Sequence, residues 1–246
     1  MITCTDLRLS ISSKIVLDDI NVSFKSGEIW GIIGPPGAGK TVLIKVIAGL
    51  YTPQFGTVEI DGDEISSMKE EQMVFVRRKI GMLFQNNALF DFMTVGENVA
   101  FPLARANPDA SSEQIRKTAL ERLKDVGLLG SENKFPSELS GGMRKRVGVA
   151  RAIITEPPVV IYDEPTAGLD PVTTSKIYDL LTDIQARSNS AVIAISSDIS
   201  GLRTFVKNIL FLHRGKVLFS GRNEDIDKCE DPVVYQFLRG LDRGPL

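Results

Sequence analysis

The feature that most constrains this chain is a glycine-rich segment, Gly34–Thr41, which reads Gly-Pro-Pro-Gly-Ala-Gly-Lys-Thr. It fits the pattern of a phosphate-binding loop, in which glycines leave backbone N–H groups free to surround phosphate oxygens. An apolar run, Ile29–Ile33, precedes the loop, and a segment rich in apolar residues, Val42–Leu50, follows it. This order predicts a buried strand, a loop and a helix, so that the positive end of the helix faces bound phosphate.

The loop pattern predicts a separate task for two of its side chains. Lys40 is expected to hold the β- and γ-phosphates of a nucleotide, and the Thr41 hydroxyl is expected to ligate Mg²⁺. The other candidates for nucleotide contact are Gly34, Pro35, Pro36, Gly37, Ala38, Gly39 and Val42. The alternative is an ordinary glycine-rich turn, since a chance match has odds on the order of one in a hundred in a chain of this length. Further motifs are therefore needed to decide.

Composition narrows the class of protein. The 246 residues are 43% hydrophobic and carry a net charge of −2, which supports a sizeable core and implies no general attraction to nucleic acid. Two cysteines at opposite ends and one histidine, His213, predict neither a disulfide framework nor a metal cluster. No signal peptide is visible, and no apolar run approaches the ~20 residues that span a bilayer. We therefore expect a cytosolic chain that reaches a membrane only through a partner.

The order of predicted elements indicates one domain in which helices interrupt a β-rich core. Strands are expected at residues 3–9, 20–24, 29–33, 57–60, 80–84, 158–162 and 191–195, with a hairpin formed by 208–212 and 216–219. Helices are expected at residues 42–50, 69–76, 111–126 and 140–154 and after Thr94, Asp170 and Asp231. Residues 1–87 and 156–230 would then form the core, 88–155 a helical subdomain and 231–246 a C-terminal tail.

Two further motifs carry chemistry. An apolar run from Val159 ends in Asp163 and Glu164. At the carboxyl end of a strand, Asp163 can help to fix Mg²⁺ and Glu164 can polarise an attacking water molecule. The alternative for this pair is a solvated turn. Upstream, the residues Ser140, Gly141 and Gly142 open a predicted helix and would present a second set of bare backbone amides.

Together these motifs resemble the ATPase subunit of an ABC transporter, and the resemblance covers nearly the whole chain. It implies an α/β P-loop NTPase fold with a RecA-like core, a small antiparallel β region and an inserted helical subdomain. In that family the Ser140–Gly142 segment faces the γ-phosphate bound by the other subunit, so the resemblance implies a head-to-tail homodimer that hydrolyses ATP with Mg²⁺. It further implies that Gln85 touches Mg²⁺ and water and that Asp170 crosses the dimer interface.

The resemblance also implies an integral membrane permease bound to the helical subdomain, with Phe84, Phe90, Phe92 and Phe101 forming its groove. Two positions depart from the family. Ser197 stands where the family has a switch histidine; a serine is shorter and cannot carry imidazolium charge, so we expect slow hydrolysis. Ile11 stands where an aromatic ring stacks on adenine, so we expect loose nucleotide selectivity.

Softer signals resemble one branch of the family, the Mla-type ATPases of MCE-domain systems, which serve phospholipid transport. These signals are Leu83–Phe90, Thr94–Leu103, Gly142–Val147, which includes Met143 in place of the usual Gln, and Gln236–Leu246. They imply phospholipid cargo, MCE-domain and small accessory partners, and a peripheral place on the cytoplasmic face of a bacterial inner membrane.

Other functions stay open from the sequence. The chain could energise another cargo, act in cell division without transport, or serve as a regulatory module with slow turnover. The basic cluster Arg144–Arg146 could suggest nucleic acid or anionic lipid. Because the cluster is short, we interpret it as the polar face of its helix, partly facing nucleotide, and expect no nucleic-acid partner.

Overall fold

The computed structural model describes all residues from 1 to 246 and contains two β-sheets. Sheet A is antiparallel with the order β2-β1-β4-β5, and sheet B has the order β10-β9-β3-β8-β7-β6. The strands are β1 Ile2–Ile11, β2 Lys14–Phe24, β3 Ile29–Ile33, β4 Phe55–Ile60, β5 Asp63–Glu64, β6 Ile80–Leu83, β7 Val159–Asp163, β8 Ala191–Ile195, β9 Asn208–His213 and β10 Lys216–Arg222. The helices are α1 Lys40–Ile47, α2 Glu70–Arg77, α3 Val95–Ala106, α4 Ser112–Asp125, α5 Gly141–Ile153, α6 Pro171–Arg187, α7 Ile199–Phe205 and α8 Pro232–Arg239, with short 3-10 turns at Pro136–Glu138 and Ile226–Lys228.

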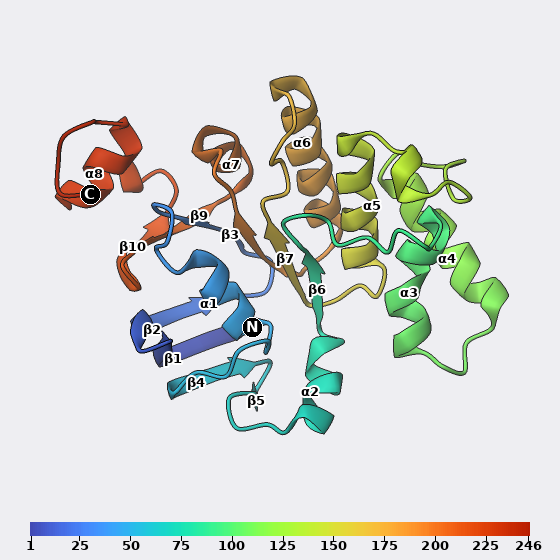
Figure 1. Cartoon of the computed structure of the whole chain (residues 1–246), viewed down its shortest axis with the longest axis horizontal. Helices are drawn as coiled ribbons and strands as arrows, with labels where there is room; N and C mark the ends of the chain where they lie inside the picture. Colours follow the sequence, from blue (N-terminus) through green and yellow to red (C-terminus); the bar gives the residue numbers. More distant parts are fainter.

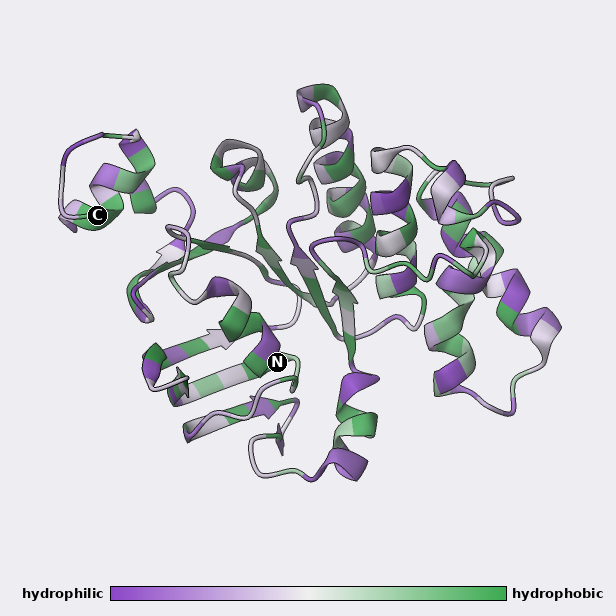
Figure 2. Cartoon of the chain, viewed as in Figure 1, coloured by the Kyte–Doolittle hydropathy of each residue, from purple (hydrophilic) through white to green (hydrophobic).

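Sheet B separates two hydrophobic cores because its central strands are apolar on both faces. All strand pairs in this sheet are parallel except β9–β10, and β3, β7 and β8 are buried along their whole length. In β7 the side chains of Val159 and Ile161 pack with α1 and sheet A, whereas Val160 and Tyr162 pack with α5 and α6. Figures 1 and 2 show these apolar strands between the two sets of elements. Continuous apolar strands of this kind are typical of a parallel sheet covered on both sides.

This architecture confirms the expected fold class. The helices α3, α4 and α5 lie together at one end of sheet B (Figure 1), and Val95, Val99, Ala119 and Leu123 join them to the core shared with Tyr162. No helix of the chain combines the length and the apolar character that crossing a bilayer requires.

Strand boundaries in sheet A differ from the sequence prediction. The two short strands expected at 3–9 and 20–24 are one long hairpin, because the chain turns tightly at Ser12 and Ser13, which have φ of 48° and 65°. Asp6 and Asp19 also have positive φ and lie at shifts in the register, so polar residues are accommodated within the paired strands. The sequence prediction also missed β5 and the seven-residue helix α7, both too short to show periodicity.

The predicted helix caps are largely confirmed. Thr94 and Glu97 form a reciprocal capping box, and the side chains of Ser140 and Asp170 accept bonds from the N–H groups of Met143 and Thr173. The second predicted box is only half formed, since Ser111 caps α4 but Gln114 turns its side-chain oxygen toward the Ser111 hydroxyl instead of the backbone. These caps fix where α3, α5 and α6 begin.

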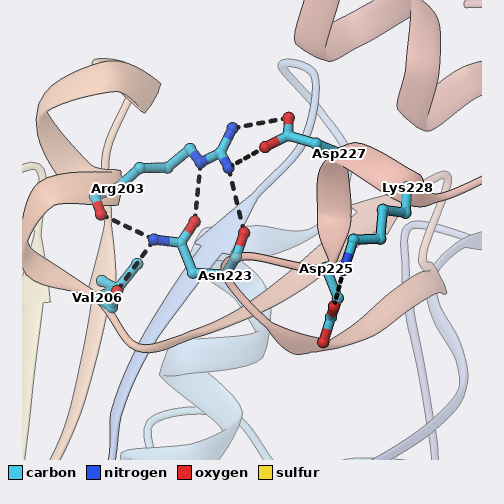
Figure 3. Close-up of polar contacts among 6 residues, drawn as sticks. All are labelled: Arg203, Val206, Asn223, Asp225, Asp227 and Lys228. Atoms are coloured by element: carbon cyan, nitrogen blue, oxygen red, sulfur yellow. Dashed lines mark hydrogen bonds and ion pairs between the residues drawn. The ribbon is translucent and has the colours of Figure 1, made fainter.

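Arg203 fastens α7 to the segment that follows β10 (Figure 3). Its guanidinium donates to both carboxylate oxygens of Asp227 and, through Nε at 2.8 Å, to Oδ1 of Asn223. In return, Nδ2 of Asn223 donates to the carbonyls of Arg203 and Val206 at 2.8 and 3.2 Å. Asn223 therefore satisfies the carbonyls that the end of α7 leaves without helical partners.

We predict that Asn223→Ala lowers the free energy of unfolding by about 1–3 kcal/mol, because it strands these carbonyls and the Arg203 Nε without partners. Lys228→Ala removes only the exposed ion pair with Asp225 and should change stability by less than about 0.5 kcal/mol. Urea denaturation of the two variants measures the difference. Equal losses would contradict the role assigned to Asn223.

Candidate functional site

The loop between β3 and α1 has room only for glycine at two positions. At Gly34, with φ of 142°, an added Cβ would lie 2.0 Å from the carbonyl oxygen of Leu212. At Gly39, with φ of 107°, it would lie 2.8 Å from the carbonyl oxygen of Val16. Gly37 has open space around it. The loop thus follows its neighbours closely at both ends while its middle is open, which suits the approach of a ligand to its backbone.

Lys40 lies at the start of α1, where Gly39 provides no capping side chain. Its ammonium is folded back on its own loop and donates to the carbonyls of Gly34 and Pro35 at 2.6 and 3.0 Å. Burial lowers the pKa of Lys40, and the carboxylates of Glu164 and Asp163 oppose this effect. Thr41 and Val42, in the same turn, are half-buried. The turn therefore combines free amides, a cation and a hydroxyl, a set suited to phosphate.

The two carboxylates lie at the end of β7, beside this turn. Asp163 is only 4% exposed, and burial and the neighbouring Glu164 raise its pKa, opposed by Lys45, Lys145 and Lys40. Strand alternation places Asp163 on the same face as Val159 and Ile161, the face that α1 covers. The structure thus brings Lys40, Asp163 and Glu164 together.

Ser197 binds the carboxylate of Glu164. Both its backbone N–H and its hydroxyl donate to one oxygen of Glu164, each at 3.0 Å. Glu164 has a φ of 52°, and its own N–H donates to the carbonyl of Ile195 at 2.9 Å, so the turn after β7 is held against the turn after β8. The residue at the switch-histidine position is thereby in direct contact with the proposed water-positioning carboxylate.

Lys145 is the residue that the sequence interpretation treated wrongly. It does not lie on a polar face of its helix, because it is 4% exposed and its ammonium donates to the carbonyls of Gln85 and Glu164 at 3.1 and 2.7 Å. The side chain of Gln85 itself is exposed. A lysine inside a run of three basic residues gives no sequence signal of burial, since only the packing of α5 on β6 decides which of the three turns inward.

The Ser140–Gly142 segment lies away from the loop of its own chain. A Cβ at Gly142 would lie 2.9 Å from the Thr173 side chain, and one at Gly141 would lie 3.5 Å from Leu169. Asp170 caps α6 next to them, at 2.9 Å from the Thr173 N–H. The structure therefore groups Ser140–Gly142 with Asp170, whereas α5 and α1 cover opposite faces of sheet B.

Ile11 lies at the tip of the β1–β2 hairpin, where it pairs with Lys14 and is 41% exposed. The same hairpin reaches the loop through Val16, whose carbonyl faces Gly39. Ile11 thus belongs to an element that touches the loop.

A groove of about 690 Å³ lies between α2, α3 and α5. Phe84, Phe90 and Phe101 line it, whereas Phe92 does not and is 77% exposed. The expectation that all four rings form the groove is therefore wrong for Phe92, which projects to solvent beside Phe90. The charged residues that line the groove are four arginines, Arg77, Arg78, Arg105 and Arg151, and no acidic residue lines the groove.

The chain matches the family model described as ABC transporter over residues 17–167. It is 38% identical over 240 residues, covering 98% of this chain and 69% of the relative, to the probable ribonucleotide transport ATP-binding protein mkl of Mycobacterium leprae. It is 35% identical, covering all of this chain and 93% of the relative, to the intermembrane phospholipid transport system ATP-binding protein MlaF of Haemophilus influenzae. Among solved structures, the dimeric ATP-binding cassette MJ0796, in a post-hydrolysis state with ADP and Pi, superimposes with a TM-score of 0.83 at 33% identity, covering 91% of this chain and 99% of that one. The chain therefore belongs to the ABC transporter family.

Proposed function

We propose that this chain is the ATP-hydrolysing subunit of a transporter that moves phospholipid through a separate membrane permease. The observation that carries the proposal is the meeting of Lys40, Asp163 and Glu164 beside an open, glycine-rich loop. The relatives support the transport part, since both are named as ATP-binding proteins of transport systems.

The residues present fit ATP and Mg²⁺. The loop from Gly34 to Thr41 offers amides and the Lys40 ammonium to the β- and γ-phosphates. The hydroxyl of Thr41, the amide oxygen of Gln85 and the carboxylate of Asp163 are oxygen donors of the kind that Mg²⁺ prefers. A bound Mg²⁺ would neutralise charge that develops on the phosphates.

In this assignment Glu164 positions the attacking water. Its hydrogen bonds to Ser197 hold one carboxylate oxygen and leave the other available to water. The close contact also supports a sensing role for Ser197, because a phosphate that recruits the Ser197 hydroxyl would release one bond to Glu164.

A complete site requires two chains in this proposal. The amides at the start of α5 lie across sheet B from the loop that precedes α1, so a second subunit supplies the Ser140–Gly142 segment. A head-to-tail homodimer provides two such sites with one kind of chain. Asp170, next to the same segment, would lie at the dimer interface, and the dimeric state of MJ0796 supports the arrangement.

The groove beside α3 and α5 is the proposed seat of the permease. Its apolar rings suit the apolar face of a helix, and its arginines suit a carboxylate on that helix. Residues 88–155 would then move as a helical subdomain that carries the permease. We place the subunit on the cytoplasmic face of a bacterial inner membrane, with MCE-domain and small accessory subunits as further partners.

The two relatives are named for different cargoes, one for phospholipid transport and the other for ribonucleotide transport. A mild-detergent pull-down of the tagged chain from its source membranes, with mass spectrometry of proteins and lipids, tests the proposed cargo. We expect a multi-span permease, an MCE-domain protein and copurified phospholipid. An Arg78→Glu/Arg105→Glu variant, whose groove repels carboxylates, should lose the permease. Recovery of the tagged chain without any membrane protein would contradict the proposal. A permease that copurifies with ribonucleotide instead of phospholipid would favour ribonucleotide as the cargo.

We predict that Ser197→His raises the ATP turnover number by about tenfold, because imidazole reaches farther and can carry positive charge toward a γ-phosphate. Steady-state kinetics of the purified chain measures the effect. The matched control is Ser220→His, which places the same residue on exposed β10 and should leave turnover unchanged. An unchanged rate in Ser197→His would remove the argument that this position limits hydrolysis.

We predict that ATP and GTP bind with dissociation constants within about threefold of each other, since an isoleucine side chain makes no hydrogen bond to either base edge and offers no aromatic face. Competition binding to the Glu164→Gln chain measures both constants without hydrolysis. Ile11→Tyr should tighten binding of ATP by a few-fold through stacking. A preference for ATP above about tenfold in the parent chain would show that other residues read the base.

A further inference from the structure

Lys145 is a buried cation that joins two backbone turns. Its side chain is 4% exposed, and a charge in such a place is costly unless it is paired or hydrogen-bonded. Its ammonium donates to the carbonyls of Gln85 and Glu164, at 3.1 and 2.7 Å. The nearby carboxylates of Glu164 and Asp163 stabilise its charge, although burial lowers its pKa.

The two carbonyls occupy equivalent places at the end of the sheet. Strands β6 and β7 are parallel neighbours, with Leu83 paired to Tyr162, and Gln85 and Glu164 each follow two residues later. Strand β6 ends at Leu83, so the backbone hydrogen bonds between β6 and β7 stop before Gln85 and Glu164. The Lys145 ammonium therefore bridges the strands just beyond the end of their ladder.

The rest of α5 is shaped to hold the same turn. Gly148 lies one turn after Lys145, and a Cβ there would lie 2.4 Å from Leu83, so the glycine lets the helix rest directly on β6. One turn further, Arg151 donates to the carbonyls of Asn87 and Ala88, whose φ values are 61° and 46°. Two buried cations of α5, Lys145 and Arg151, thus hold the turn from Gln85 to Ala88.

We propose that Lys145 is a positioning residue for ATP hydrolysis, which sets the spacing between the Gln85 turn and Glu164 and ties both to α5. The inference rests on the proposed function, in which Gln85 and Glu164 act on Mg²⁺ and water. Because α5 begins at Ser140–Gly142, movement of that segment toward a nucleotide on the partner subunit would be passed by Lys145 to the hydrolytic residues of its own chain.

This role predicts a specific kinetic signature. Lys145 makes no hydrogen bond to the Gly34–Thr41 loop, so its loss should spare nucleotide binding. It should instead slow the chemical step, because the two carbonyls separate and the groups beyond them lose their mutual alignment. Arginine keeps the charge and the donors, whereas methionine keeps only the length.

The test compares kcat and KM for ATP, with the melting temperature, in Lys145→Met, Lys145→Arg and the control Arg146→Met. Arg146 is the next residue of the helix, and its guanidinium points to the end of α4, where it donates at 3.4 Å to the Val126 carbonyl and lies beside Gly127. It therefore lies away from these turns and does not face nucleotide, contrary to the interpretation of the basic cluster. We expect Lys145→Met to lower kcat by about tenfold or more with KM within about twofold. Lys145→Arg should recover at least about a third of the parent kcat, and Arg146→Met should stay within about twofold.

A parent-like kcat in Lys145→Met, or equal losses in the Arg and Met variants, would overturn the inference. If Lys145→Met does not fold, Lys145→Gln, which keeps a neutral donor, replaces it and should show the same selective loss of kcat. A parent chain without ATPase activity would instead contradict the proposed function, so the two failures are distinguishable.

Discussion

The parallel pairing of β3, β8 and β7 is the constraint on which the site depends. Because these strands run in one direction, the loop after β3, the carboxylates at the end of β7 and Ser197 after β8 all emerge at one edge of sheet B. Ligand sites of α/β proteins form at this edge, outside the carboxyl ends of the strands. Apolar residues on both faces of these strands bury the sheet between two hydrophobic cores, and the strand pairing sets the positions of these groups.

The same sheet keeps the two glycine-rich helix starts apart. Alternate side chains of β7 belong to different cores, one shared with α1 and one with α5. A chain with this division cannot fold its own Ser140–Gly142 segment over its own loop without breaking the sheet. In the proposed function, the need for a second subunit follows from the placement of α1 and α5. The ammonium groups of Lys40 and Lys145 lie near the carboxylates of Asp163 and Glu164 and offset their mutual repulsion.

Much of this could be predicted from the sequence, because the informative residues are local. The loop fit a fixed spacing, the caps of α3, α5 and α6 had recognisable side chains, and the apolar run before Asp163 had the length of a buried strand. What could not be predicted depends on contacts between distant segments. The burial of Lys145 arises only when α5 packs on β6, and the hydrogen bonds from Ser197 to Glu164 form only when β7 pairs with β8. The exposure of Phe92 depends on the path of the segment between β6 and α3. Likewise, the β1–β2 hairpin continues through bulges at Asp6 and Asp19. In a hydropathy pattern, polar residues at these positions suggest that a strand ends, so the full length of the hairpin could not be predicted.

The central claim is that a complete site takes residues from two chains, and the mass of the Glu164→Gln chain in solution tests it most directly. Light scattering with Mg²⁺ should show about 27.0 kDa without nucleotide and twice that mass with ATP. A chain that carries Ser140→Arg together with Glu164→Gln should keep the mass of one chain in both conditions, because the arginine side chain blocks the amides offered to the partner. The mass of one chain for Glu164→Gln with ATP would contradict the two-chain site. So would the mass of a dimer for the Ser140→Arg/Glu164→Gln chain with ATP.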